Sequence, residues 1–238
     1  NDNDKTTINI LGGNSLSTMA LGTAGAAAIG VAAGTEATGL VTLNASAFNG
    51  ALTAFFGDDV IDTNLTITGG AGVDNVHGTF TGAATVKMSG VERLHIESDA
   101  TGTLDLSGVT DLARVYVDDD NTAATTTLTD LVSGADVLLT TGVTASNLIV
   151  DLKDKALLDN TLNLELTATV GTANIDIEDV EILNLDVEGT TSADLAGLAM
   201  TTASKSSTLN VTGDSALTVT ALHADVTTIN ASGMTTGG

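Results

Sequence analysis

Short segments in which apolar and polar residues alternate recur along the chain, and each ends near Gly, Asp or Ser. Clear examples are VERLHIESD (91–99), LARVYVDDD (112–120), VEILNLDVEG (180–189) and STLNVTGD (207–214). Alternation over four to six residues that stops at a turn-forming residue is typical of a short strand with one buried face. The pattern therefore predicts an all-β protein.

The centres of these segments recur at a nearly constant interval of about twenty residues. The interval is seen from Leu94 to Val115, from Leu164 to Leu183 and from Leu209 to Ile229. A repeat of this length indicates the coils of a solenoid, in which each coil buries its apolar face against its neighbours. We predict a parallel β-helix or β-solenoid with short turns and few helices.

A β-sandwich is the alternative, because it also uses many short strands at regular spacing. The solenoid is favoured because Thr and Asn fill many polar positions, where they can form ladders between coils, and because the chain has no proline. Helical spacing is plausible only in 129–139 and 192–200. We treat residues 1–238 as a single solenoid segment, a fragment of a longer protein.

Composition and charge narrow the function classes. Hydrophobic residues make up 42% of the chain but aromatic residues only 2%, so the core must consist of aliphatic side chains. The formal net charge of −23 argues against binding to nucleic acid or to anionic lipid. No cysteine is present, which excludes disulfides, and the apolar stretch 24–34 is too short to predict direct membrane insertion.

One glycine-rich stretch stands out, GGAGVDNVH at 69–77. It matches the nonapeptide G-G-x-G-x-D-x-U-x at every fixed position, with Gly70, Gly72 and Asp74 as its polar turn and Val76 as its apolar residue. It does not fit a dinucleotide-binding or phosphate-binding loop, which need other glycine spacings or a following lysine. The upstream segment 56–62 repeats half of the motif, with Gly57 and Asp59 in the register of Gly72 and Asp74.

Such a turn is suited to calcium. Glycine can adopt a positive φ, which lets carbonyl oxygens point inward, and aspartate supplies the hard anionic oxygen that Ca²⁺ prefers. An ordinary Asp-Gly turn between strands remains the alternative. Asp118 and Asp120, which follow a strand and face the same way, could share a second ion or form a solvated turn.

The histidines at 77, 95 and 223 have no partner at metal-binding spacing, so we assign them to plain strand or surface positions.

The glycine–aspartate motifs resemble those of the RTX family. The threonine-rich segment 207–233 and TTINILGG at 6–13 are similar to repeats of RTX-type S-layer proteins from Gram-negative bacteria. The resemblance implies a calcium-dependent, largely β-helical cell-surface protein that is exported by type I secretion and assembles into a two-dimensional lattice. It also implies that Gly70, Gly72 and Asp74, and with them Gly57 and Asp59, bind Ca²⁺. The offset between the two motifs departs from the tandem nonapeptides of a regular β-roll.

We therefore expect a non-enzymatic structural component of a bacterial surface layer. Its partners would be lattice neighbours of the same chain and cell-envelope polysaccharide. Two alternatives stay open: an RTX-type adhesin or biofilm-matrix module, and the calcium-binding accessory region of a secreted hydrolase.

Overall fold

A computed structural model shows that every regular element of the described part of the chain is a β-strand. No helix in that part is long and apolar enough to cross a membrane. The described residues are 6–11, 19–21, 40–56, 65–80, 82–97, 101–118, 125–140, 147–167, 170–189, 192–202 and 206–235.

The strands form two parallel ten-stranded sheets, and successive strands along the chain alternate between them. Sheet A holds the odd-numbered strands β1 (Thr6–Asn9), β3 (Leu40–Asn44), β5 (Thr66–Thr68), β7 (Gly82–Ser89), β9 (Gly102–Val109), β11 (Thr125–Leu131), β13 (Asn147–Leu152), β15 (Val170–Glu178), β17 (Ser192–Thr201) and β19 (Ala216–Val219). Sheet B holds the even-numbered strands β2 (Met19–Leu21), β4 (Thr53–Phe56), β6 (Asn75–Thr79), β8 (Arg93–Glu97), β10 (Arg114–Asp118), β12 (Asp136–Leu139), β14 (Thr161–Leu166), β16 (Ile182–Val187), β18 (Ser207–Gly213) and β20 (Val226–Met234).

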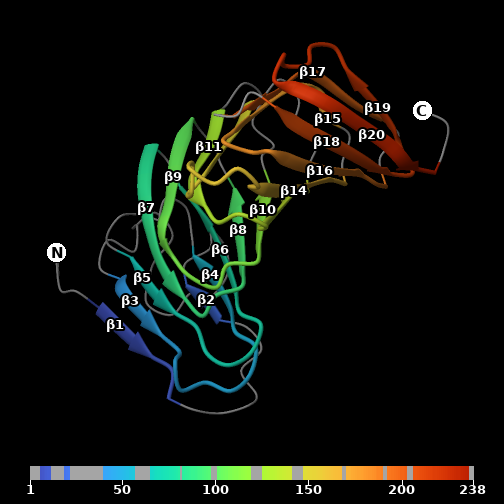
Figure 1. Cartoon of the computed structure of the whole chain (residues 1–238). Coiled ribbons are helices and arrows are strands. Elements are labelled where there is room, and N and C mark those ends of the chain that lie inside the picture. The colour runs from blue at the N-terminus through green and yellow to red at the C-terminus, as the bar shows by residue number, and fades with distance from the viewer. Residues whose placement is uncertain are drawn as a thin grey trace.

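Each coil of the chain therefore contributes one strand to each sheet, which confirms the predicted β-solenoid. Figure 1 shows β1 and β20 at opposite ends of the stack and the strand direction turning between β7 and β18. Such turning is the accumulated twist of neighbouring parallel strands.

Strand register confirms two of the three predicted coil intervals. Leu94 pairs with Val115, and Leu209 pairs with Ile229. The third interval was wrong, because Leu164 pairs with Leu185 and not with Leu183, two positions earlier. A shift of two positions keeps every side chain on the same face, so alternation alone cannot distinguish the two registers.

The core lies between the two sheets and is filled by aliphatic side chains. In β14 and β16 exposure alternates residue by residue, with Leu162, Leu164 and Leu166 buried and the residues between them half-buried. Each fully buried leucine or valine contributes about 1.5–3 kcal/mol by leaving water. Because each coil covers the next, this burial repeats along the stack.

The two segments with helical spacing are strands. In β17, Ala196 and Gly197 both lie on the outer side, so the buried residues Leu195 and Leu198 are three apart and imitate a helical period. The segment 129–139 is split between β11 and β12 by a turn at Ser133 and Gly134.

Candidate functional site

The glycine–aspartate motif forms a corner between sheets A and B, immediately before β6. Asp74 is only 1% exposed. Its Oδ1 accepts a hydrogen bond from the amide of Leu52 on the preceding coil at 2.8 Å, and its Oδ2 accepts one from the amide of Gly70. Both carboxylate oxygens therefore bind backbone N–H groups.

The glycines of the motif are required by close packing. A Cβ on Gly70 would lie 2.2 Å from the carbonyl oxygen of Phe48, and a Cβ on Gly72 would lie 2.5 Å from the amide nitrogen of Ala51. Neither glycine has a positive φ. We expected these glycines to form a left-handed turn that points carbonyl groups inward. Instead, glycine is needed at these positions because the chain passes close to the backbone of the previous coil.

The same device recurs at two further corners. Glu92 Oε2 accepts the amide of Asp74 at 2.7 Å, and Glu181 Oε2 accepts the amide of Asn160 at 3.1 Å. The three acceptors occupy equivalent positions, because each is the residue just before a strand of sheet B: Asp74, Glu92 and Glu181. Each accepts a hydrogen bond from the backbone amide at the equivalent position of the neighbouring coil, just before the preceding strand of sheet B. We call these three the corner carboxylates. They link successive coils at the point where the strands of sheet B begin, beside the first backbone hydrogen bonds between those coils.

The predicted calcium ligands have different outcomes. Gly70, Gly72 and Asp74 come together at the corner, where their geometry suits a backbone cap, and their role as calcium ligands stays a prediction. Asp118 lies half-buried at the end of β10, in register with Glu97 of β8. The remaining candidates lie outside the described residues: Gly57, Asp59 and Asp120. Within the described ranges, no three or more His, Asp or Glu side chains are placed to hold one metal ion.

An aromatic column runs along the outer face of sheet B across four neighbouring strands. The ring centroids of Phe55 and His77 are 4.4 Å apart, and those of His77 and His95 are 3.8 Å apart. His95 and Tyr116 are also 3.8 Å apart, with ring planes inclined by only 3°. The rings cover one another's faces, so the column presents mainly its edges to solvent.

The histidines of this column resist protonation. Burial lowers the pKa of His77, and burial together with the charges of His77 and Arg93 lowers the pKa of His95 to about 4. Protonation of the His95 ring would place a positive charge next to His77 and Arg93. The column is thus built from neutral rings at physiological pH.

Both arginines of the chain lie beside this column, at Arg93 and Arg114, which are paired in register. Arg114 donates from Nη2 to Asp136 Oδ2 at 2.8 Å, and its Nη1 lies 3.7 Å from Glu165. The hydrogen bond to Asp136 raises the pKa of Arg114. Arg93 is exposed and has no ion pair among the described residues.

Toward the C-terminal end this row of side chains becomes an amide ladder. Asn163 Nδ2 donates to Asp136 Oδ1 at 2.9 Å, and similar contacts between amide side chains follow along the stack. Asn184 donates to Asn163 at 2.8 Å, and Asn210 donates to Asn184 at 2.9 Å. The polar outer positions are therefore ordered along the axis of the solenoid.

Sheet A carries a contrasting group of acidic side chains, which we call the acidic face. Its members are Asp105, Asp151, Asp176, Glu178 and Asp179. Lys155 Nζ lies 2.7 Å from Asp151 Oδ2 and 3.6 Å from Asp179 Oδ2, and the charge of Lys153 acts on Asp105. Burial, and then the charges of Asp151 and Asp176, raise the pKa of Glu178. Negative charge is thus crowded on this side of the stack.

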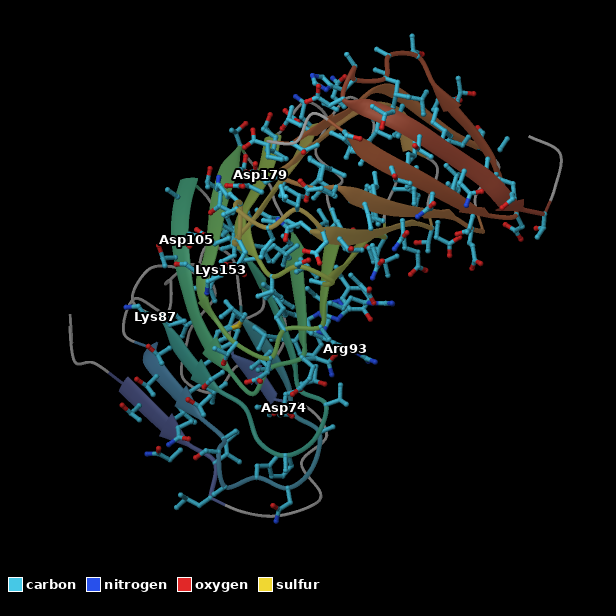
Figure 2. The ribbon with its side chains drawn as sticks, viewed as in Figure 1. Asp74, Lys87, Arg93, Asp105, Lys153 and Asp179 are labelled. Atoms are coloured by element: carbon cyan, nitrogen blue, oxygen red, sulfur yellow. The ribbon has the colours of Figure 1, made fainter. Side chains whose placement is uncertain are left out.

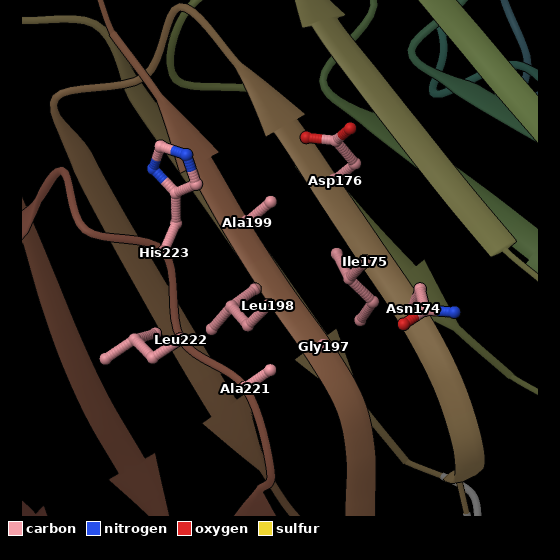
Figure 3. Close-up of a pocket in the computed structure, with 9 residues that line it drawn as sticks. All are labelled: Asn174, Ile175, Asp176, Gly197, Leu198, Ala199, Ala221, Leu222 and His223. Atoms are coloured by element: carbon pink, nitrogen blue, oxygen red, sulfur yellow. The ribbon is translucent and has the colours of Figure 1, made fainter.

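A shallow groove of about 310 Å³ adjoins the acidic face where β17 meets the segment after β19. Figure 3 shows Ala199 between the polar side chains of Asp176 and His223, with Gly197 and Ala221 further along the groove, between Asn174 and Leu222. The small residues leave room for a ligand, whereas Asp176 Oδ1 is buried beneath the surface and has no hydrogen-bond partner among the described residues. The groove combines an apolar floor with acceptor groups at its rim.

Sequence reasoning missed the aromatic column and the arginine pair. His77, His95 and Tyr116 occupy outward positions in alternating segments, and each is paired in register with the next, one coil further along. Once the coil length is assigned, this spacing is the signal that would place the rings above one another.

Comparison of the chain with protein-family models, with curated proteins and with solved structures finds no match.

Proposed function

We propose that this chain is a structural component of a bacterial surface layer, stabilised by calcium and self-assembling into a two-dimensional lattice outside the cell. The observation that carries the proposal is the continuity of both parallel sheets, with ordered side-chain rows along their outer faces. A stack of this kind is a stiff body whose lateral surface repeats from coil to coil. Repeating lateral surfaces suit regular contacts between copies.

Calcium enters the proposal through electrostatics. The chain has a formal net charge of −23, and the carboxylates of the acidic face outnumber the lysines beside them. A net charge of this size opposes both compact folding and close contact between copies. Divalent cations that bind the folded chain would relieve this repulsion and stabilise it by mass action.

A calcium titration followed by circular dichroism, light scattering and negative-stain electron microscopy tests both parts. We expect the melting temperature to rise with calcium and crystalline patches to form, and both effects to reverse in a chelator. A melting temperature that is unchanged by chelation contradicts the role of calcium. Monodisperse particles at every calcium concentration contradict self-assembly.

The groove beside Asp176 and His223 favours a second candidate function, an adhesin-type module that binds glycans. Its acceptor groups could bind sugar hydroxyls above the apolar floor. Retention of monodisperse protein on a glycan array would support this candidate. Loss of that retention in Gly197→Leu, which fills the groove, would place the binding there.

A further inference from the structure

The arginines and outward-facing aromatic side chains of sheet B form one strip, which we define as Phe55, His77, His95, Tyr116, Arg93 and Arg114. The chain contains only five Phe, Tyr and Trp residues in total and only two arginines. Two of the five aromatic residues, Phe55 and Tyr116, and both arginines lie in this strip. Arginine and aromatic side chains are enriched at the centres of protein interfaces.

The geometry of the strip limits what it can bind. The rings stack face to face, so the column offers few free ring faces on which a sugar could lie. Ring edges carry partial positive charge, and the guanidinium of Arg93 carries a full one. Because Arg114 already faces Asp136 and Glu165, the guanidinium of Arg93 is the part of the strip that is complementary to a carboxylate of a partner. A planar guanidinium binds a carboxylate through two parallel hydrogen bonds.

The same chain provides a matching surface on its opposite side. Arg93 belongs to sheet B, whereas the acidic face belongs to sheet A and the turns that follow its strands. Figure 2 shows Arg93 on the opposite side of the stack from Asp105 and Asp179. The two surfaces therefore cannot meet within one molecule.

We propose that the arginine–aromatic strip of one copy docks on the acidic face of a second copy. This contact joins two different surfaces, so it continues from copy to copy and does not close into a two-fold dimer. The inference rests on the proposed self-assembly and supplies one of its lattice contacts. Arg93 is the central residue, because Arg114 is already paired with Asp136 and Glu165.

Two single substitutions and their mixture test the contact. Arg93→Glu reverses the charge of an exposed side chain, and Glu178→Lys removes a carboxylate whose ionisation is already disfavoured. Each variant alone should associate at least tenfold more weakly than the native chain in sedimentation velocity at 0.15 M salt with calcium. An equimolar mixture should recover association, because each variant supplies the surface that its partner needs.

Lys87→Glu is the control, since it makes the same change in net charge at an exposed position of β7 in sheet A, outside the strip and one strand from Asp105 of the acidic face. Because it adds a carboxylate beside the acidic face and leaves the strip intact, it should associate at least as strongly as the native chain. If the native chain assembles and Arg93→Glu assembles equally well, the docking inference is overturned and the proposed function stands. If the native chain never assembles, both are overturned. Binding of polygalacturonate that depends on Arg93, without self-association, would assign the strip to an acidic glycan and overturn the second copy as its partner.

Discussion

The carboxylate of Asp74 accepts the amide hydrogen of Leu52 at 2.8 Å, across the boundary between two coils of the solenoid. Its other oxygen accepts the amide of Gly70 within its own turn. A buried backbone N–H without a partner costs free energy comparable to a lost hydrogen bond. The residue that the sequence motif offers as a calcium ligand thus already closes the corner of the fold.

Replacing Asp74 by Asn should lower the free energy of unfolding by about 2–3 kcal/mol, because one amide hydrogen would then face the side-chain NH₂ group. Urea denaturation of the variant and the native chain measures the loss. The same loss is expected with calcium and with a chelator, since the hydrogen bonds involve only the chain. A loss that appears with calcium and disappears on chelation would instead identify Asp74 as a calcium ligand.

Replacing Gly70 by Ala tests the close packing of the corner. The new Cβ would lie 2.2 Å from the carbonyl oxygen of Phe48, so the backbone of one coil must shift. We expect the free energy of unfolding to fall by more than about 3 kcal/mol, which is toward the upper end of the effects of single substitutions on stability. The matched control is Gly134→Ala, where φ is +84° and nothing lies within 4 Å of the new Cβ. The free energy of unfolding of this control variant should fall by only about 1–2 kcal/mol, because of backbone strain. Equal losses would contradict the packing explanation.

Replacing His95 by Phe should change how stability depends on pH. The folded-state pKa of about 4 lies below the ordinary value of 6.5, so the neutral ring contributes its full stability above pH 6.5. That contribution is lost as the pH falls toward 4, and half-exposure limits it to the order of 1 kcal/mol. Phenylalanine keeps a ring in the stack but does not titrate.

Urea denaturation at several pH values between neutrality and the folded-state pKa of His95 measures this effect. The variant should gain stability relative to the native chain as the pH falls. The comparison cancels the titration of the carboxylates that both proteins share. A difference that stays constant with pH would contradict the titration of His95 as its cause.

The strands and their parallel stacking could be predicted because alternation and a repeat near twenty residues are properties of the local sequence. The register of β14 could not, because Leu162, Leu164 and Leu166 fit the core equally well after a shift of two positions. The hydrogen bond between Asn184 and Asn163 and the cap of Glu181 on Asn160 are made only in the register that pairs Leu164 with Leu185.

The motif at 69–77 identifies a special corner of the fold. Glycine and aspartate there serve close packing and amide capping, and the sequence alone does not distinguish these roles from ion binding, so the calcium role stays a prediction. The arginine–aromatic strip depends on contacts between residues that lie one coil apart in the sequence. Such contacts appear only after the coil register is known.

Replacing Glu178 by Gln should stabilise the fold at neutral pH. Burial and the charges of Asp151 and Asp176 raise the pKa of Glu178, so its ionised form is less favourable in the folded chain than in the unfolded chain. This destabilisation is present above the folded-state pKa and disappears as the pH falls below the ordinary value of 4.5. We expect a gain of about 0.5 kcal/mol at neutral pH, since solvent screens a group that is only partly buried.

The gain should shrink in high salt and in calcium, because both reduce the repulsion among these carboxylates. Thermal melting at low and at molar salt, with and without calcium, measures both effects. Glu188→Gln is the control, since Glu188 is fully exposed and its pKa is raised mainly by Asp186. It should give a smaller gain, which salt alone removes. If Glu178→Gln is neutral at low salt, the acidic face does not destabilise the chain, and the electrostatic argument for calcium there fails.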